Sequence, residues 1–176
     1  RCKANCPIST PIPEVIGLFK EDKIKEAGKI LFENNPLSVV CSIVCPHENQ
    51  CKGNCIKGIK ETPVNFSEIE REISEEFLDN LELTQDTILE DKIAIIGGGP
   101  AGITAAFILA KKGYQVTIFD ENDKIGGVLR YGIPEFRLSR DIIDKYEEAL
   151  LKLNVKIRPN TLIGTVITLD MLKSDG

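Results

Sequence analysis

The sequence contains no tryptophan, one methionine and one histidine, and it has no cysteine after residue 55. No apolar run approaches the roughly 20 residues that a membrane-spanning helix requires, so we expect no membrane association. Basic residues are outnumbered, with 22 Lys and Arg against 27 Asp and Glu. The resulting net charge of −5 gives no electrostatic attraction to nucleic acid. No secretory signal peptide is visible, and we therefore expect a cytoplasmic protein.

The composition is that of a folded polypeptide, with 42% hydrophobic and 28% charged residues. A length of 176 residues allows one ordinary domain or two small ones. All six cysteines lie between residues 2 and 55. In the absence of secretory features, this asymmetry favours a metal or cluster site over disulfides.

A glycine motif follows a short apolar run at 92–96, which reads as a strand. The motif is Gly97-x-Gly99-x-x-Gly102, and an apolar, helix-like stretch continues to residue 110. Strand, tight turn and helix in this order predict a dinucleotide site, with the pyrophosphate on the N–H groups of the new helix. The predicted cofactor-binding residues are Gly97, Gly98, Gly99, Pro100, Ala101 and Gly102.

The second predicted strand, 115–119, is followed directly by an acidic residue. Asp120 lies eighteen positions past Gly102, where a carboxylate can accept hydrogen bonds from both ribose hydroxyls. FAD and NAD share this half-site, so both remain open. The glycine doublet of Gly126-Gly127-Val128 lets the chain run close to a large cofactor, which favours FAD.

The two halves of the chain differ in their predicted secondary structure. Residues 1–80 show helical patterns near 13–19, 22–31, 37–44 and 66–81, with a polar loop at 45–60 and no strand pattern. Residues 92–176 read as β-α-β-loop-α-β, with a helix capped by Ser139 and a third strand at 155–158. We therefore predict a multi-domain chain, an all-helical domain (1–80) followed by a partial α/β Rossmann-type domain (92–176).

The segment between these domains is strongly acidic. Residues 61–91 contain eleven acidic side chains and one basic one, Arg71. We interpret this stretch as a solvated helix face followed by a linker at 81–91, with a docking surface for a partner as the alternative.

The cysteines fall into three pairs with the same separation: Cys2-x3-Cys6, Cys41-x3-Cys45 and Cys51-x3-Cys55. Structural zinc sites usually use pairs separated by two residues, whereas Cys followed by Pro occurs in iron–sulfur ligand runs. An iron–sulfur site is therefore favoured, with zinc or buried free thiols as alternatives. The histidine, His47, is expected to be neither a ligand nor an acid.

Four stretches resemble a known family, the small (beta) subunit of NADPH-dependent glutamate synthase. Its relatives include the N-terminal part of dihydropyrimidine dehydrogenase and the large subunit of NADH-dependent ferredoxin:NADP oxidoreductase. The resemblance covers essentially the whole chain. It is carried by Asn35-Pro36, by residues 44–51 with Cys45-Pro46, by Pro63-Val64, and most specifically by the run from Gly126 to Leu138.

The resemblance implies two [4Fe–4S] clusters in an α-helical ferredoxin-like domain. It implies that Cys6, Cys45 and Cys51 ligate one cluster, with Glu70 as its fourth ligand. Cys2 and Cys55 would belong to the second cluster, whose remaining cysteines lie upstream in relatives. Cys41 matches a family cysteine that is expected not to be a ligand.

The resemblance also implies FAD contacts at 97–102, at Asp120 and the stretch to Val128, at Arg137 near the flavin ring, and at Ile163 near the adenine. Relatives continue into a second glycine motif for NADPH and a closing part of the FAD domain. This chain is therefore expected to be a truncated piece, with the NADP site outside it and no NAD(P)H oxidation activity alone.

The function implied is a flavin and iron–sulfur oxidoreductase subunit of glutamate biosynthesis. It would take hydride from NAD(P)H and pass single electrons to the large catalytic subunit of glutamate synthase or to a ferredoxin-type acceptor. Alternatives are a subunit of NADH-dependent ferredoxin:NADP oxidoreductase or of a sulfide dehydrogenase. A different class remains open, a non-catalytic, zinc-stabilised nucleotide-binding module. No acid, base or nucleophile is predicted.

Overall fold

The computed structural model of the chain describes residues 1–81 and 88–175. The chain divides into two compact units, Arg1–Leu81 and Glu82–Gly176. The predicted linker at 81–91 includes residues 82–87, which lie outside the described residues. Each unit is described below by itself.

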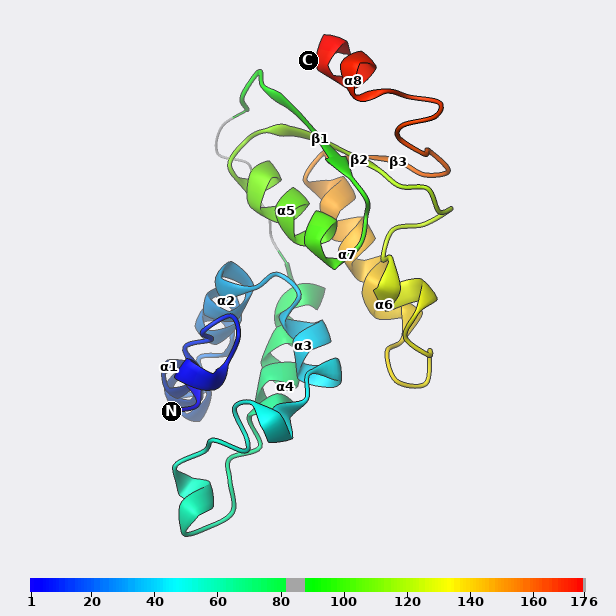
Figure 1. Ribbon diagram of the computed structural model, residues 1–176. Coiled ribbons are helices and arrows are strands. Elements are labelled where there is room, and N and C mark those ends of the chain that lie inside the picture. Colours follow the sequence, from blue (N-terminus) through cyan, green and yellow to red (C-terminus); the bar gives the residue numbers. More distant parts are fainter. Residues whose placement is uncertain (82–87, 176) are drawn as a thin grey trace. The chain divides into compact units, whose positions relative to one another are not determined.

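The first unit is helical throughout, as the sequence predicted. Its helices are α1 (Ile12–Lys20), α2 (Ile24–Asn34), α3 (Ser38–Val44) and α4 (Phe66–Asp79). Three 3-10 turns, η1 (Lys3–Asn5), η2 (His47–Asn49) and η3 (Lys57–Ile59), lie in the connecting segments. Helix α4 packs against the other three helices and forms the centre of the unit (Figure 1).

The core of this unit is small and includes a thiol. One buried cluster comprises Ile12, Val15, Ala27, Leu31, Cys51, Phe66 and Ile73, and Phe32, Leu37, Val39, Val40 and Leu78 are buried as well. The apolar residues of α4 recur every three or four positions and so form one buried stripe. A core of this size benefits from a bound metal cluster as an additional cross-link.

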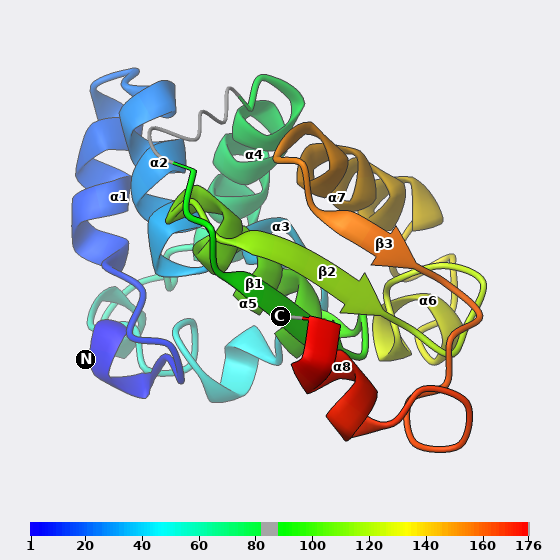
Figure 2. The ribbon, with the colours of Figure 1, turned by 90° about the horizontal axis from the view of Figure 1, so that it is seen from above.

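The second unit contains a parallel sheet of three strands in the order β1-β2-β3. The strands are β1 (Lys92–Ile96), β2 (Gln115–Phe119) and β3 (Lys156–Arg158), and the first two match the predicted bounds. Its helices are α5 (Pro100–Lys111), α6 (Val128–Tyr131), α7 (Arg140–Lys152) and α8 (Leu169–Asp175). Figures 1 and 2 show α5 and α7 on one face of the sheet and α8 on the other.

Helix α7 forms where the sequence placed it. The Ser139 hydroxyl accepts a hydrogen bond from the N–H of Asp141 at 3.2 Å and caps the helix. Its buried face includes Tyr146, whose ring meets that of Phe107 on α5 edge-on with the ring centres 6.1 Å apart. This contact joins α5 and α7, which cover the same face of the sheet.

Two short helices, α6 and α8, of four and seven residues, were not predicted. None of the helices in the described part of the chain has the length and apolar character needed to cross a membrane.

Candidate functional site

The predicted nucleotide turn joins β1 to α5. Gly97 has a φ of +96°, a conformation that side-chain-bearing residues rarely adopt, and Gly99 caps the helix. The first N–H groups of α5 have no partner within the helix and carry its positive dipole end. A Cβ at Gly102 would lie 1.9 Å from the Gly97 carbonyl oxygen, so this glycine permits the close helix–strand packing.

A second glycine turn lies against the first. Gly126 donates its N–H to the carbonyl oxygen of Gly98 at 2.7 Å. Gly127 adopts a φ of +51°, and a Cβ there would approach the Cα of Gly99 to 2.9 Å. Neither turn carries a side chain where Gly127 lies against Gly99. Backbone N–H groups therefore line the space beside the two turns. This arrangement fits the pyrophosphate of a dinucleotide.

Asp120 lies at the end of β2 and is 4% exposed. One carboxylate oxygen accepts the N–H of Gly98 at 2.5 Å, and the other accepts the backbone and side-chain N–H groups of Asn122 at 2.8 and 3.0 Å. Of the roughly four acceptor positions of a carboxylate, about one is left for a ribose hydroxyl. Asp120 therefore also holds the first turn in place, a role that the sequence analysis did not predict.

The remaining predicted cofactor residues lie in segments around these turns. Val128 begins α6 and is exposed, and Arg137 is exposed in the loop before α7. Ile163 lies beyond β3 and pairs with Ile167 in an isolated bridge. Nearby, the N–H of Thr161 donates to the carbonyl oxygen of Asp120 at 2.7 Å, which keeps this segment at the end of β2.

A second candidate site lies in the helical unit, around a buried carboxylate. Glu70 is on the buried stripe of α4 and is 5% exposed. Burial raises its pKa to about 8. Among residues 1–81 and 88–175, no hydrogen-bond donor or cation accompanies this carboxylate. A buried acid without a partner is costly, and a metal centre removes that cost.

Three of the predicted thiol ligands share the surroundings of Glu70. Burial, and after it the charge of Glu70, raises the pKa of Cys51 to about 11. Burial and the neighbouring Cys6 and Glu70 also raise the pKa of Cys45. Cys45 thus lies within electrostatic reach of Cys6, Cys51 and Glu70, and Cys51 within reach of Glu70. Thiols that resist ionisation in this way become thiolates when a metal compensates their charge.

Cys41 shares these surroundings, because after burial the charges of Glu70, Cys45 and Cys6 also raise its pKa. Burial raises the pKa of Cys41 to about 11, and its sulfur accepts a hydrogen bond from the Asn35 side chain at 3.2 Å. Hydrogen bonding to the backbone, of Val64 first, lowers the pKa of the half-buried Cys55. Cys2 is half-buried beside the core.

No three Cys, His, Asp or Glu side chains in the described part of the chain converge closely enough to hold a single metal ion. A [4Fe–4S] cluster places four irons between its ligands and so needs a wider arrangement. All six thiols are free of disulfides.

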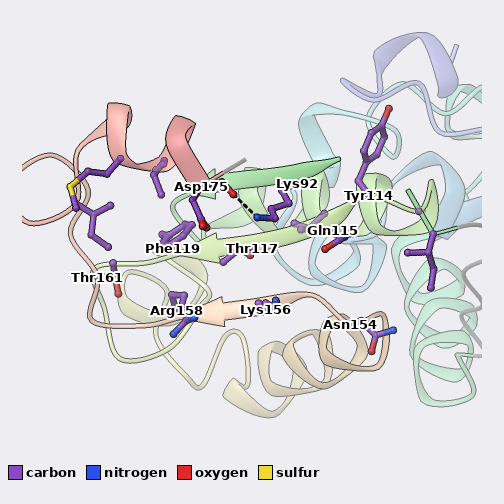
Figure 3. A pocket seen from close by; sticks show the side chains of 16 residues that line it. Lys92, Tyr114, Gln115, Thr117, Phe119, Asn154, Lys156, Arg158, Thr161 and Asp175 are labelled. Carbon is purple, nitrogen blue, oxygen red and sulfur yellow. Dashed lines mark hydrogen bonds between the residues drawn. The ribbon is translucent and has the colours of Figure 1, made fainter. Parts of the chain in front are cut away.

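A cavity of about 770 Å³ lies in the second unit, between the outer face of the sheet and the segment that carries α8 (Figure 3). Lys92, Lys156 and Arg158 line it together with Tyr114 and Phe119, and none of the predicted site residues does. This cavity therefore has no part in the predicted chemistry.

Comparison with known proteins connects both sites to families. Residues 1–81 match the family described as dihydropyrimidine dehydrogenase domain II, 4Fe-4S cluster, and residues 95–139 match the NAD(P)-binding Rossmann-like domain. Over 99% of its length, the chain is 32% identical to the NADPH glutamate synthase small chain of Escherichia coli K12. The chain belongs to the glutamate synthase small-chain family.

Other relatives include both a subunit of a different enzyme and a second glutamate synthase small chain. The chain is 35% identical, over 99% of its length, to PreT of Escherichia coli K12, a subunit of NAD-dependent dihydropyrimidine dehydrogenase. It is 32% identical, over 98%, to the glutamate synthase small chain of Azospirillum brasilense. The chain spans 38%, 43% and 36% of these three relatives, about two fifths of their length. Membership of the glutamate synthase small-chain family therefore gives the chain an iron–sulfur segment and the start of a Rossmann-like segment.

The surroundings of Glu70 predict how the stability of the metal-free chain depends on pH. Burial raises the pKa of Glu70 to about 8 in the folded chain, against an ordinary value of 4.5, so folding favours the protonated form. The contribution of protonated Glu70 to the free energy of unfolding is complete below pH 4.5, its pKa in the unfolded chain. This contribution is lost as the pH rises through about 8, its pKa in the folded chain. We expect the metal-free Glu70→Gln chain to be more stable than the wild-type chain at a pH of about 8. At pH 4.5, the two should have similar stability.

Urea denaturation at these two pH values measures this effect. Glu68→Gln, at an exposed position on the same helix, is the matched control and should behave as wild type at both. An equal response of the two variants would contradict the account of Glu70.

Proposed function

We propose that this chain is part of a flavin and iron–sulfur oxidoreductase. FAD would occupy the two glycine turns of the segment 92–176, and a [4Fe–4S] cluster would occupy the helical segment 1–80. Cys6, Cys45, Cys51 and Glu70 would ligate this cluster, and Cys2 and Cys55 would contribute to a second one. The family matches support the cluster and the nucleotide fold, and the glycine doublet favours FAD.

One observation carries the proposal most strongly: a buried carboxylate without a cation shares its surroundings with three thiols. Such a donor set is unfavourable in a protein that binds no metal, because every member is a potential anion. Bound iron would offset the charge of all four groups. A chain that merely used cysteine as a small apolar residue would not need a buried carboxylate, Glu70, near its thiols.

When bound, a flavin exchanges electrons in pairs, as a hydride, or singly, and an iron–sulfur cluster takes them singly. The protein contributes placement. The N-terminus of α5 would hold the pyrophosphate, and Asp120 would fix the turn and offer one acceptor to the ribose. Val128, Arg137 and Ile163 would line the path from the flavin ring to the adenine. The helical unit would exclude water from the thiolates.

The relatives suggest the electron donor and the acceptor. The names of the small chains specify NADPH and glutamate synthase. We propose NAD(P)H as the hydride donor, bound outside this chain, and the large catalytic subunit of glutamate synthase as the acceptor. A ferredoxin-type acceptor is the second candidate. Free thiols are compatible with a cytoplasmic protein.

An anaerobic titration of the intact gene product with NADPH and then NADH tests this function. Bleaching of the flavin absorbance, followed by the paramagnetic signal of a reduced [4Fe–4S] cluster, is the expected result. A protein that stays colourless, contains about one zinc and responds to neither nucleotide would instead be the zinc-stabilised module.

A further inference from the structure

A buried arginine lies directly behind the second glycine turn. Arg130, on α6, is 9% exposed. Its Nε donates to the carbonyl oxygen of Ile125 at 2.8 Å, and its terminal nitrogen donates to the carboxylate of Asp144 on α7 at 2.6 Å. The guanidinium therefore ties the backbone just before Gly126 to the middle of a long, capped helix.

This tie continues through the backbone to the first glycine turn. Ile125 contributes its carbonyl to Arg130, and the next residue, Gly126, donates its N–H to the Gly98 carbonyl. The packing is also close, because a Cβ at Gly98 would lie 2.6 Å from the Ile125 side chain. The N–H of Gly98 in turn donates to the carboxylate of Asp120. The backbone of Gly98 is thus held by Gly126 at its carbonyl oxygen and by Asp120 at its N–H.

An arginine suits this position for a physical reason. Burying a cation is unfavourable unless it is paired, and Asp144 supplies the pairing charge. The planar guanidinium donates in two fixed directions at once, which an ammonium group cannot reproduce. Lys124 adds a second donor to the same Asp144 oxygen at 3.1 Å. The ion pair therefore fixes both ends of the segment 124–130.

We propose that Arg130 and Asp144 are positioning residues of the nucleotide site, holding the two glycine turns at the separation that a dinucleotide requires. They act through the Ile125–Gly126 peptide rather than by contact with the cofactor. The inference rests on the proposed function for the identity of the ligand, FAD, but the coupling between the turns is a property of the protein alone.

The test uses the full chain with Arg130→Met, Asp144→Asn and the double variant. Glu148→Gln is the control, since Glu148 is exposed on the same helix and loses the same charge. We expect Arg130→Met to weaken FAD binding about tenfold, the size of one charge-assisted hydrogen bond. The double variant should be no weaker than Arg130→Met, because the two residues act as one unit.

Amide hydrogen exchange of the FAD-free chain gives a readout that does not need the cofactor. Protection of the Gly98 and Gly126 amides should fall in Arg130→Met and Asp144→Asn, while protection in β2 and α7 should be retained. Unchanged protection at both glycines, or an equal loss throughout the sheet and α7, would overturn the inference. If the intact gene product also binds no FAD, the proposed function fails, and hydrogen exchange still decides whether the ion pair couples the turns.

Discussion

Replacing Gly102 with alanine is expected to abolish nucleotide binding and to lower the free energy of unfolding of the second unit by about 3 kcal/mol. The added Cβ would lie 1.9 Å from the Gly97 carbonyl oxygen and 3.3 Å from the Ile95 side chain. A backbone oxygen cannot rotate away as a side chain can, so α5 must move off β1. Urea denaturation and FAD titration of the variant measure the two losses.

Gly99→Ala is the matched comparison, because it adds the same methyl group in the same turn. Here the nearest atom to the new Cβ is the Gly127 Cα, at 3.9 Å, and the φ of −75° suits alanine. We expect stability within about 1 kcal/mol of wild type. FAD binding should nevertheless fall by about a hundredfold or more, because the methyl group blocks backbone approach to the pyrophosphate. Equal stability of the two variants would contradict this packing account.

Replacing Cys45 with serine is expected to prevent assembly of the cluster, because it removes one of the proposed thiolate ligands. Cys41→Ser is the control: Cys41 lies one helical turn earlier, and a serine hydroxyl can accept the hydrogen bond that Asn35 now gives to sulfur. Iron, acid-labile sulfide and absorbance near 400 nm are measured after anaerobic reconstitution. Loss of the cluster in Cys41→Ser but not in Cys45→Ser would refute the ligand assignment.

Much of the nucleotide half could be predicted because its signals are local. The spacing of Gly97, Gly99 and Gly102 fixes a turn between a strand and a helix, and β1 and β2 have the predicted bounds. Ser139 marks the start of α7 by a contact only two residues long. Such features need no knowledge of the distant chain.

The hydrogen bond from the Gly98 N–H to Asp120 could not be predicted in the same way. Whether its carboxylate faces a ribose or the Gly98 peptide depends on the packing of segments 22 residues apart. Its bond to Asn122 was visible in principle, since an aspartate often accepts the N–H two residues later. The ion pair of Arg130 with Asp144, 14 residues apart, carries no sequence signal of this kind.

In the helical half, the sequence predicted the helices but not the environment of the candidate ligands. The apolar spacing of α4 places position 70 on the buried face, which is a local signal. The absence of a partner for Glu70 among the described residues, and its proximity to thiols from two other segments, are tertiary features. They give physical support to a ligand set that the sequence supplied only through its resemblance to a family.

The most direct test of the account is the iron and acid-labile sulfide content of the chain, expressed and purified without air. A [4Fe–4S] cluster on Cys6, Cys45, Cys51 and Glu70 predicts about four of each per chain, and the Glu70→Ala variant should hold clearly less. A wild-type chain that is correctly folded but contains neither iron nor sulfide would contradict the central claim.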